Sequence, residues 1–158
     1  MPKDTPSMAK NKMRRSLAAI FDPHPSRHEI DELWEYFESR CAYCGMPIIR
    51  ESRTGHLDHL VPFSEGGSNN IHNHALSCAR CNGDEKREES WQSFLERKSE
   101  NVQAFQNRKE KIDKWLALAP SLSSNLELTA RAEKIIEEAI KGFEISVEKM
   151  RALRRNGT

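Results

Sequence analysis

The sequence has no long apolar run, no hydrophobic segment at its N-terminus and only four cysteines in 158 residues. Its apolar stretches fall well short of the roughly 20 residues that a membrane-spanning helix needs. Because the N-terminus lacks the apolar region of a secretory signal, we expect a cytoplasmic protein with no membrane partner. Cysteines in that compartment are mostly reduced, so paired cysteines favour metal binding over disulfides.

Net charge is also nearly absent, because 25 lysines and arginines stand against 24 aspartates and glutamates. A near-neutral chain does not exclude a nucleic-acid partner if its basic residues cluster. Here they gather at the two ends of the chain, as Lys3, Lys10, Lys12, Arg14, Arg15, Arg151, Arg154 and Arg155. These ends are either solvated tails or a contact surface for nucleic acid, and the charge pattern leaves both open.

Changes in composition divide the chain into three parts. Residues 1–25 are polar and basic and are predicted to be disordered. Residues 26–98 hold every cysteine, and a helix is predicted over about 27–40, with Ser26 as its cap and Glu29 as the capping-box partner. Residues 99–158 are predicted to form a helical hairpin with a linker at 121–125, because apolar residues recur every three or four positions on both sides of it.

Short elements are predicted around the cysteines. Two strands are expected over 46–50 and 55–61, joined by a polar loop. The segment 64–70 is rich in glycine and asparagine and is predicted to be a loop, after which a short helix begins near Asn73. Another helix is predicted over 84–98. The mixture indicates an α+β fold class.

The four cysteines form two Cys-x-x-Cys pairs, Cys41 with Cys44 and Cys78 with Cys81. Four thiolates in two pairs suit tetrahedral Zn²⁺, which binds soft sulfur well. A four-sulfur site leaves no open position for water, so the predicted zinc is structural and fixes the two ends of the intervening segment. The alternative is four ordinary buried cysteines. The long segment between the pairs is expected to carry the function.

The segment that the cysteine pairs enclose resembles the HNH nuclease family. The family's order is a cysteine pair, Asp-His-x-x-Pro, a glycine pair, an asparagine, a second cysteine pair, a histidine or asparagine, and a lysine. The matching elements are Cys41-x-x-Cys44, Asp58-His59-x-x-Pro62, Gly66-Gly67, Asn73, Cys78-x-x-Cys81, Asn82 and Lys86. The resemblance covers about residues 41–90, and the rest of the chain carries none.

This resemblance implies a ββα-metal core, stapled by the four-cysteine zinc site and flanked by an N-terminal helix and the C-terminal helical hairpin. It implies that Asp58 and Asn82 bind a catalytic ion and that His59 is the general base. Asn73 would hold the loop and orient His59, and Lys86 would approach a DNA phosphate. Asn82 stands where many members have histidine, and its oxygen suits hard Mg²⁺ or Mn²⁺.

Elementary chemistry agrees with these roles. A neutral imidazole, with a reference pKa of about 6.5, can take a proton from water near pH 7. A divalent cation can neutralise the charge that builds on the phosphate and on the leaving 3′ oxygen. Plainer interpretations are a surface position for His59, a turn for Asn73, a helix cap for Asn82 and a solvated Lys86.

Three further histidines, His56, His72 and His74, lie near this site. Their spacing matches no ligand pattern, so hydrogen-bonding or solvent-facing roles are expected rather than a further metal site.

We therefore expect a metal-dependent endonuclease acting on DNA, in double-stranded form. The alternatives are an inactive nucleic-acid-binding module and a protein–protein adaptor. The Asp58–His59 pair argues against the first, because a binder needs no base beside a carboxylate. The helices after residue 99 are expected to bind a protein partner or a second copy of the chain, for instance in restriction, anti-phage defence or phage DNA packaging.

Overall fold

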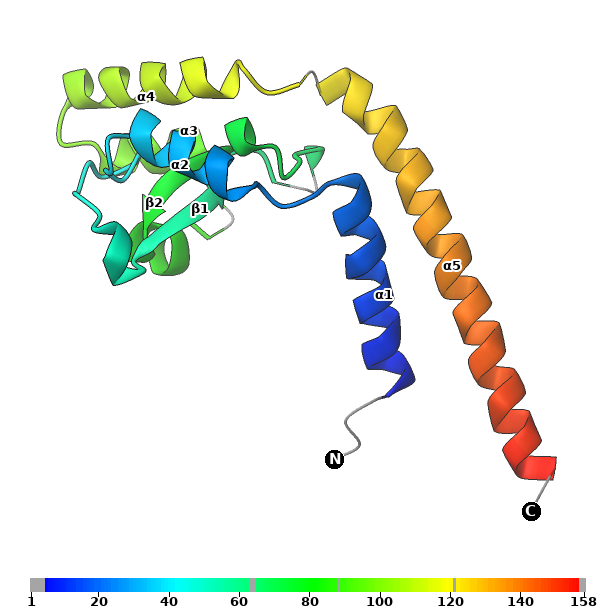
Figure 1. Ribbon diagram of the computed structural model, residues 1–158. Helices are drawn as coiled ribbons and strands as arrows, with labels where there is room; N and C mark the ends of the chain where they lie inside the picture. Colours follow the sequence, from blue (N-terminus) through cyan, green and yellow to red (C-terminus); the bar gives the residue numbers. More distant parts are fainter. Residues whose placement is uncertain (1–4, 63–64, 88, 121, 157–158) are drawn as a thin grey trace. The chain divides into compact units, whose positions relative to one another are not determined.

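The computed structural model describes residues 5–62, 65–87, 89–120 and 122–156 and divides the chain into two units. One unit is His24–Leu122, and the two ends of the chain form the other. Figure 1 shows the helices and strands of each.

The terminal unit contains two helices, α1 (Pro6–Phe21) and α5 (Leu122–Asn156). Lys10 Nζ on α1 lies 2.7 Å from Glu144 Oε1 on α5. The prediction of disorder at the N-terminus is wrong for Pro6–Phe21, while residues 1–4 lie outside the described residues. The helix begins because the Thr5 hydroxyl accepts the N–H of Met8 at 3.2 Å and Pro6 occupies the first turn.

The C-terminal segment forms helices as the sequence predicts, but these helices belong to different units, so a hairpin between them stays a prediction. Helix α4 (Val102–Leu116) belongs to the His24–Leu122 unit, where its Ile112 and Trp115 are buried. Residues 122–125 of the predicted linker are already part of α5, and residue 121 lies outside the described residues. Apolar periodicity shows that a helix buries one face, but it does not identify the element that covers it.

Helix α2 (Arg27–Tyr36) begins with the predicted capping box. The Ser26 N–H donates to Glu29 Oε2 at 2.8 Å, and the Glu29 N–H donates to Ser26 Oγ at 3.3 Å. The side-chain and backbone hydrogen bonds from Ser26 lower the pKa of Glu29. The helix presents Leu33 and Trp34 to the core.

The only sheet among the described residues is an antiparallel pair, β1 (Gly55–His59) and β2 (His74–Cys78). The strand predicted at 46–50 is wrong. Pro47 forms one isolated bridge with Arg40, since proline has no N–H for a ladder, and η1 (Arg50–Ser52) follows. The helix predicted near Asn73 is also wrong, because η3 (Ile71–Asn73) is a single turn before β2. All five β2 residues are buried, so the strand lacks the alternation that would identify it.

A π-helix, η4 (Arg80–Glu85), follows β2 directly. The Lys86 N–H donates to the carbonyl oxygen of Cys81 at 3.1 Å, which closes this wide turn. Helix α3 (Trp91–Lys98) starts later than predicted, because Arg87 has a φ of 47° and Ser90 caps the helix. The elements β1, β2 and η4 give the expected order of two strands and a helix.

The core of the His24–Leu122 unit joins α2, the sheet, α3 and α4, which confirms the α+β fold class. Its largest fully buried side chains include Leu33, Tyr43, Leu76, Phe94, Leu95 and Ile112. The indole N–H of Trp115 donates to the carbonyl oxygens of Ile71 at 3.2 Å and His74 at 2.9 Å, which ties α4 to the hairpin. Over the described part of the chain, no helix is long and apolar enough to cross a membrane.

Candidate active site

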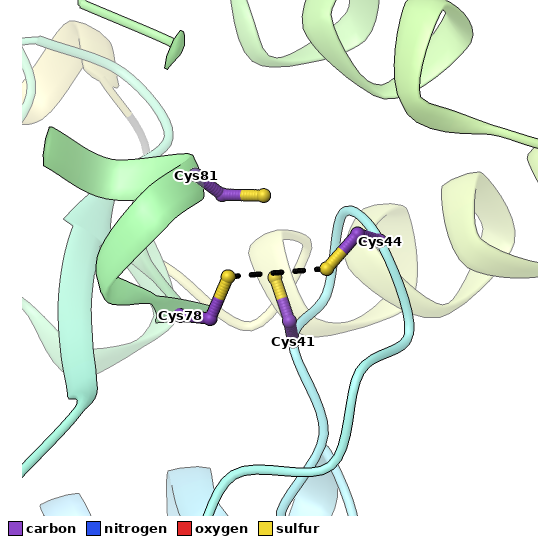
Figure 2. Close-up of side chains that lie close together, drawn as sticks. All are labelled: Cys41, Cys44, Cys78 and Cys81. Carbon is purple, nitrogen blue, oxygen red and sulfur yellow. Dashed lines mark hydrogen bonds between the residues drawn. The ribbon is translucent and has the colours of Figure 1, made fainter. Parts of the chain in front are cut away.

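The two cysteine pairs converge in space (Figure 2). All four sulfur atoms lie within 4.8 Å of one another, and the sulfurs of Cys44 and Cys78 are 3.9 Å apart. A tetrahedral zinc with Zn–S bonds of about 2.3 Å places its sulfurs about 3.8 Å apart. Gly45 has a φ of +72° and donates its N–H to the carbonyl oxygen of Cys41 at 2.8 Å, so the chain curls around the first pair.

The thiols influence one another's ionisation. A hydrogen bond from Cys81 lowers the pKa of Cys41 to about 4, and burial raises the pKa of Cys44 to about 11. The hydrogen bond to Cys41 also raises the pKa of Cys81. One buried thiolate thus opposes ionisation of its neighbours, whereas a divalent cation favours the thiolate form of each ligand. The four donors fit a structural metal such as zinc.

One cleft brings Asp58, His59 and Asn82 together, and its lining extends over β1, the residues after it and the start of α3. Asp58 and His59 are the last two residues of β1, paired with Ala75 and His74. Successive side chains of a strand point to opposite faces, and the contacts of the two residues are separate. Because the strand ends at His59, both residues still reach the cleft.

Asp58 is held through one of its two carboxylate oxygens. The Tyr43 hydroxyl donates to Oδ2, and Lys86 Nζ lies 2.8 Å from the same oxygen. Burial, followed by the charge of Asp58, raises the pKa of Tyr43 well above its usual value, so the hydroxyl stays a donor. Within the described residues no group donates to Oδ1, which leaves that oxygen available to a ligand.

The environment of Lys86 differs from the predicted one. Its side chain is buried, and Nζ also donates to the carbonyl oxygen of His59 at 3.2 Å. Its ammonium group therefore neutralises Asp58 inside the protein, and contact with a DNA phosphate stays a prediction. Arg87, the next residue, is exposed and lines the same cleft.

His59 is exposed, and two residues fix its ring. His59 Nε2 lies 3.1 Å from Asn69 Oδ1. In the tautomer that donates from Nε2 to this oxygen, Nδ1 carries no proton and can accept one. The His74 ring packs 4.2 Å from the His59 ring and donates from Nδ1 to the carbonyl oxygen of Asn70 at 2.9 Å. Burial lowers the pKa of His74 to about 4, so this neighbour stays neutral.

Asn73 lies beneath the loop that follows β1. Its Oδ1 accepts the Val61 N–H at 2.9 Å, and its Nδ2 donates to the carbonyl oxygens of Val61 and Ser68, both at 2.9 Å. The backbone N–H of Leu60 donates to the Asn73 carbonyl oxygen at 2.8 Å. A Cβ on Gly67 would lie 1.9 Å from the Val61 carbonyl oxygen, so only glycine fits beside this clamp.

Asn82 occupies the first turn of η4, directly after Cys81. Its side chain is half-buried, lines the cleft and makes no hydrogen bond with a described residue. A carboxamide oxygen from Asn82 and a carboxylate oxygen from Asp58 form the kind of oxygen donor set that Mg²⁺ or Mn²⁺ prefers. The residues present therefore fit a hard divalent ion.

The remaining histidines do not build a second metal site. Among the described residues, the four cysteines are the one group of three or more metal-ligating side chains of the His, Cys, Asp and Glu types. His72 packs on Trp115 at 4.3 Å, and burial lowers its pKa. His74 supports His59 instead of binding metal.

Two contributors, Tyr43 and Asn69, are absent from the sequence-based site. Tyr43 lies inside the first cysteine pair and contacts Asp58 fifteen positions away. Asn69 lies in the predicted loop, directly before a second asparagine, Asn70. No spacing rule singles out either residue, because both act through contacts that the fold creates.

A protein-family model described as HNH endonuclease matches residues 41–88. No curated protein matches the chain. The family consists of nucleases that use divalent metals and act on nucleic acids. Since the match spans both cysteine pairs and the strand pair between them, the chain contains an HNH endonuclease domain.

Proposed function

We propose that this domain hydrolyses phosphodiester bonds of double-stranded DNA, with His59 as general base and with Asp58 and Asn82 as ligands of one Mg²⁺ or Mn²⁺. The observation that carries the proposal is the shared cleft, in which the imidazole of His59 and the carboxylate of Asp58 at the end of β1 meet the carboxamide of Asn82 from η4.

His59 supplies the proton transfer. With Nε2 engaged by Asn69, Nδ1 takes a proton from a water molecule as the water oxygen attacks phosphorus. The bond between phosphorus and the 3′ oxygen breaks, and the 3′ oxygen takes a proton from solvent, which gives a 5′ phosphate and a 3′ hydroxyl. His74 and the Asn73 clamp hold the ring and the following loop in place for this step.

The catalytic ion would be held by Asp58 and Asn82. When bound there, a divalent ion neutralises charge on the phosphate oxygens and on the leaving 3′ oxygen. Two protein ligands leave room for water and phosphate in the coordination shell, as Mg²⁺ prefers. We assign Zn²⁺ to the four cysteines as a structural ion.

Arg87 is the proposed phosphate contact at the rim of the cleft. It is exposed, lines the cleft and forms no ion pair with a described residue, whereas the ammonium group of Lys86 is directed inward to Asp58. Phosphate contacts position DNA without reading its sequence. Replacing Arg87 with alanine should weaken DNA binding and reduce its salt dependence.

The test uses zinc-loaded protein freed of other metals, incubated with supercoiled plasmid and added Mg²⁺ or Mn²⁺. His59→Ala should lose about 10²- to 10⁴-fold in cleavage rate, the usual contribution of a general base. His28→Ala is the matched control, because His28 is exposed on α2 and its ring pairs only with Glu32, at 3.6 Å, among described residues.

Cleavage that needs no added metal and survives His59→Ala would refute the mechanism. If no metal supports cleavage but the protein retards DNA in a gel, the binding-module alternative is favoured. A parallel RNA substrate decides whether DNA is the preferred nucleic acid.

A protein partner or second copy bound through the C-terminal helices stays a prediction, as does a role in restriction, defence or DNA packaging. Helix α5 exposes the apolar side chains of Leu126, Leu128, Ile135, Ile145, Met150 and Leu153. Light scattering after size exclusion should show a dimer, and a strict monomer at high concentration would count against self-association.

A further inference from the structure

We propose that Tyr43 is a positioning residue that couples the cysteine cluster to the catalytic metal ligand Asp58. This inference rests on the proposed function, because it concerns the affinity of the same metal site. The observation behind it is that a residue between two zinc-binding cysteines donates a hydrogen bond to Asp58.

The Tyr43 ring is fixed by its surroundings. The residue is fully buried, and its ring makes an edge contact with the Phe94 ring at 5.0 Å. Its carbonyl oxygen accepts from Arg108 Nη1 at 3.0 Å. Just before it, the Ala42 N–H donates to the Leu76 carbonyl oxygen at 2.8 Å, which joins the first cysteine pair to β2.

This rigid phenol selects which oxygen of Asp58 faces a ligand. Tyr43 and Lys86 both engage Oδ2, and within the described residues no donor engages Oδ1. A carboxylate without these contacts rotates between orientations about a broad terminal torsion. Fixing Oδ2 therefore presents Oδ1 as the ligand atom and reduces the ordering that metal binding requires.

The two groups on Oδ2 contribute differently. Lys86 brings a positive charge, which also repels a divalent ion, whereas Tyr43 brings a neutral donor. Tyr43→Phe therefore removes the hydroxyl that orients the Asp58 carboxylate without changing the charge of the site. Phenylalanine keeps the ring that packs on Phe94. Cys41 and Cys44 hold the backbone on both sides of this ring, so the proposed zinc site sets the position of the hydroxyl.

The experiment measures Mn²⁺ binding to zinc-loaded protein by electron paramagnetic resonance, without DNA. Loss of a contact behind a metal ligand typically costs about 10- to 100-fold in affinity, and we expect that weakening for Tyr43→Phe. Tyr36→Phe is the matched control, since the Tyr36 hydroxyl donates to the Lys111 carbonyl oxygen at 2.7 Å, outside the cleft. The control should bind Mn²⁺ as the wild type does.

Zinc content and urea unfolding complete the test. The proposal requires that Tyr43→Phe keep its zinc and a cooperative unfolding transition. A Mn²⁺ affinity within about twofold of the wild type would overturn it, because losses of such supporting contacts are larger than that. Loss of zinc or of cooperative unfolding would show that the Tyr43 hydroxyl is needed for folding. That result would also overturn the proposal.

Asn82→Ala separates this inference from the proposed function. If the wild-type protein binds Mn²⁺ and Asn82→Ala does not, the metal site stands and Tyr43→Phe alone decides the role of Tyr43. If the wild type binds no Mn²⁺, the metal site itself fails, and the role of Tyr43 fails with it.

Discussion

Replacing Asn73 with alanine should destabilise the domain far more than the loss of an ordinary surface asparagine. The side chain is buried and makes three hydrogen bonds to the backbone, with the Val61 N–H, the Val61 carbonyl oxygen and the Ser68 carbonyl oxygen. Alanine removes all three, and the small side chain cannot replace them.

The size of the effect follows from these contacts. A typical intramolecular hydrogen bond contributes about 1 kcal/mol net, so three predict a loss of about 3 kcal/mol. At a urea dependence of about 1.5 kcal/mol per M, the unfolding midpoint should fall by about 2 M. Asn70→Ala is the control in the same loop, because its Oδ1 accepts one hydrogen bond, from the His72 N–H at 3.0 Å. That variant should lose only about 1 kcal/mol.

Urea unfolding of zinc-loaded protein, followed by tryptophan fluorescence, measures the difference between the two variants. Both proteins should keep their zinc, since Asn73 and Asn70 lie outside the cysteine cluster. An Asn73→Ala variant that is no less stable than Asn70→Ala would refute the reasoning. The three hydrogen bonds of Asn73 would then contribute no more than the single hydrogen bond that Asn70 accepts from His72.

Three further predictions concern the same unit. Gly67→Ala should cost at least about 2 kcal/mol in urea unfolding, because its Cβ would meet the Val61 carbonyl oxygen, whereas Gly83→Ala, with nothing within 4 Å, should be tolerated. Cys78→Ser should abolish zinc retention on dialysis and cooperative unfolding, and a folded, zinc-retaining variant would contradict the four-sulfur site. His74 has a pKa of about 4 when folded and about 6.5 when unfolded, so the unfolded chain binds the proton first as pH falls. Stability should therefore drop by about 2 kcal/mol more between pH 7.5 and 5.0 in the wild type than in His74→Gln, and equal drops would argue against a buried neutral His74.

The sequence predicts which residues gather at the site better than it predicts the elements around them. Asp58, His59 and Asn82 reach one cleft as the motif implies, because the strand end and the turn after Cys81 position them locally. The cysteine pairs also meet as predicted, because two Cys-x-x-Cys turns can bring four sulfur atoms to one point.

Strand pairing was harder to predict. β1 pairs with the buried segment His74–Cys78 rather than with residues 46–50. A strand covered on both faces has no period of two, and its pairing depends on contacts that no local pattern encodes. The hydrogen bond from the Tyr43 hydroxyl to Asp58 was equally hard to predict, because the sequence gives no reason to distinguish this aromatic residue from an ordinary core residue.

The helices after residue 99 show that the sequence pattern does not identify which element packs against a helix. Their amphipathic pattern correctly predicts helices, but α4 and α5 belong to different units. The partner of an apolar face depends on the rest of the chain, and here the N-terminal segment supplies α1 to the unit that contains α5.

The indole of Trp115 determines where the protein can be shortened. A fragment that stopped at residue 88, where the family match ends, would leave the carbonyl oxygens of Ile71 and His74 without this donor and would uncover the core under α3 and α4. An expression fragment of the matched domain should therefore extend over residues 24–122, about twice the matched length. During synthesis, the carbonyl oxygens of Ile71 and His74 therefore stay without this donor until Trp115 has left the ribosome.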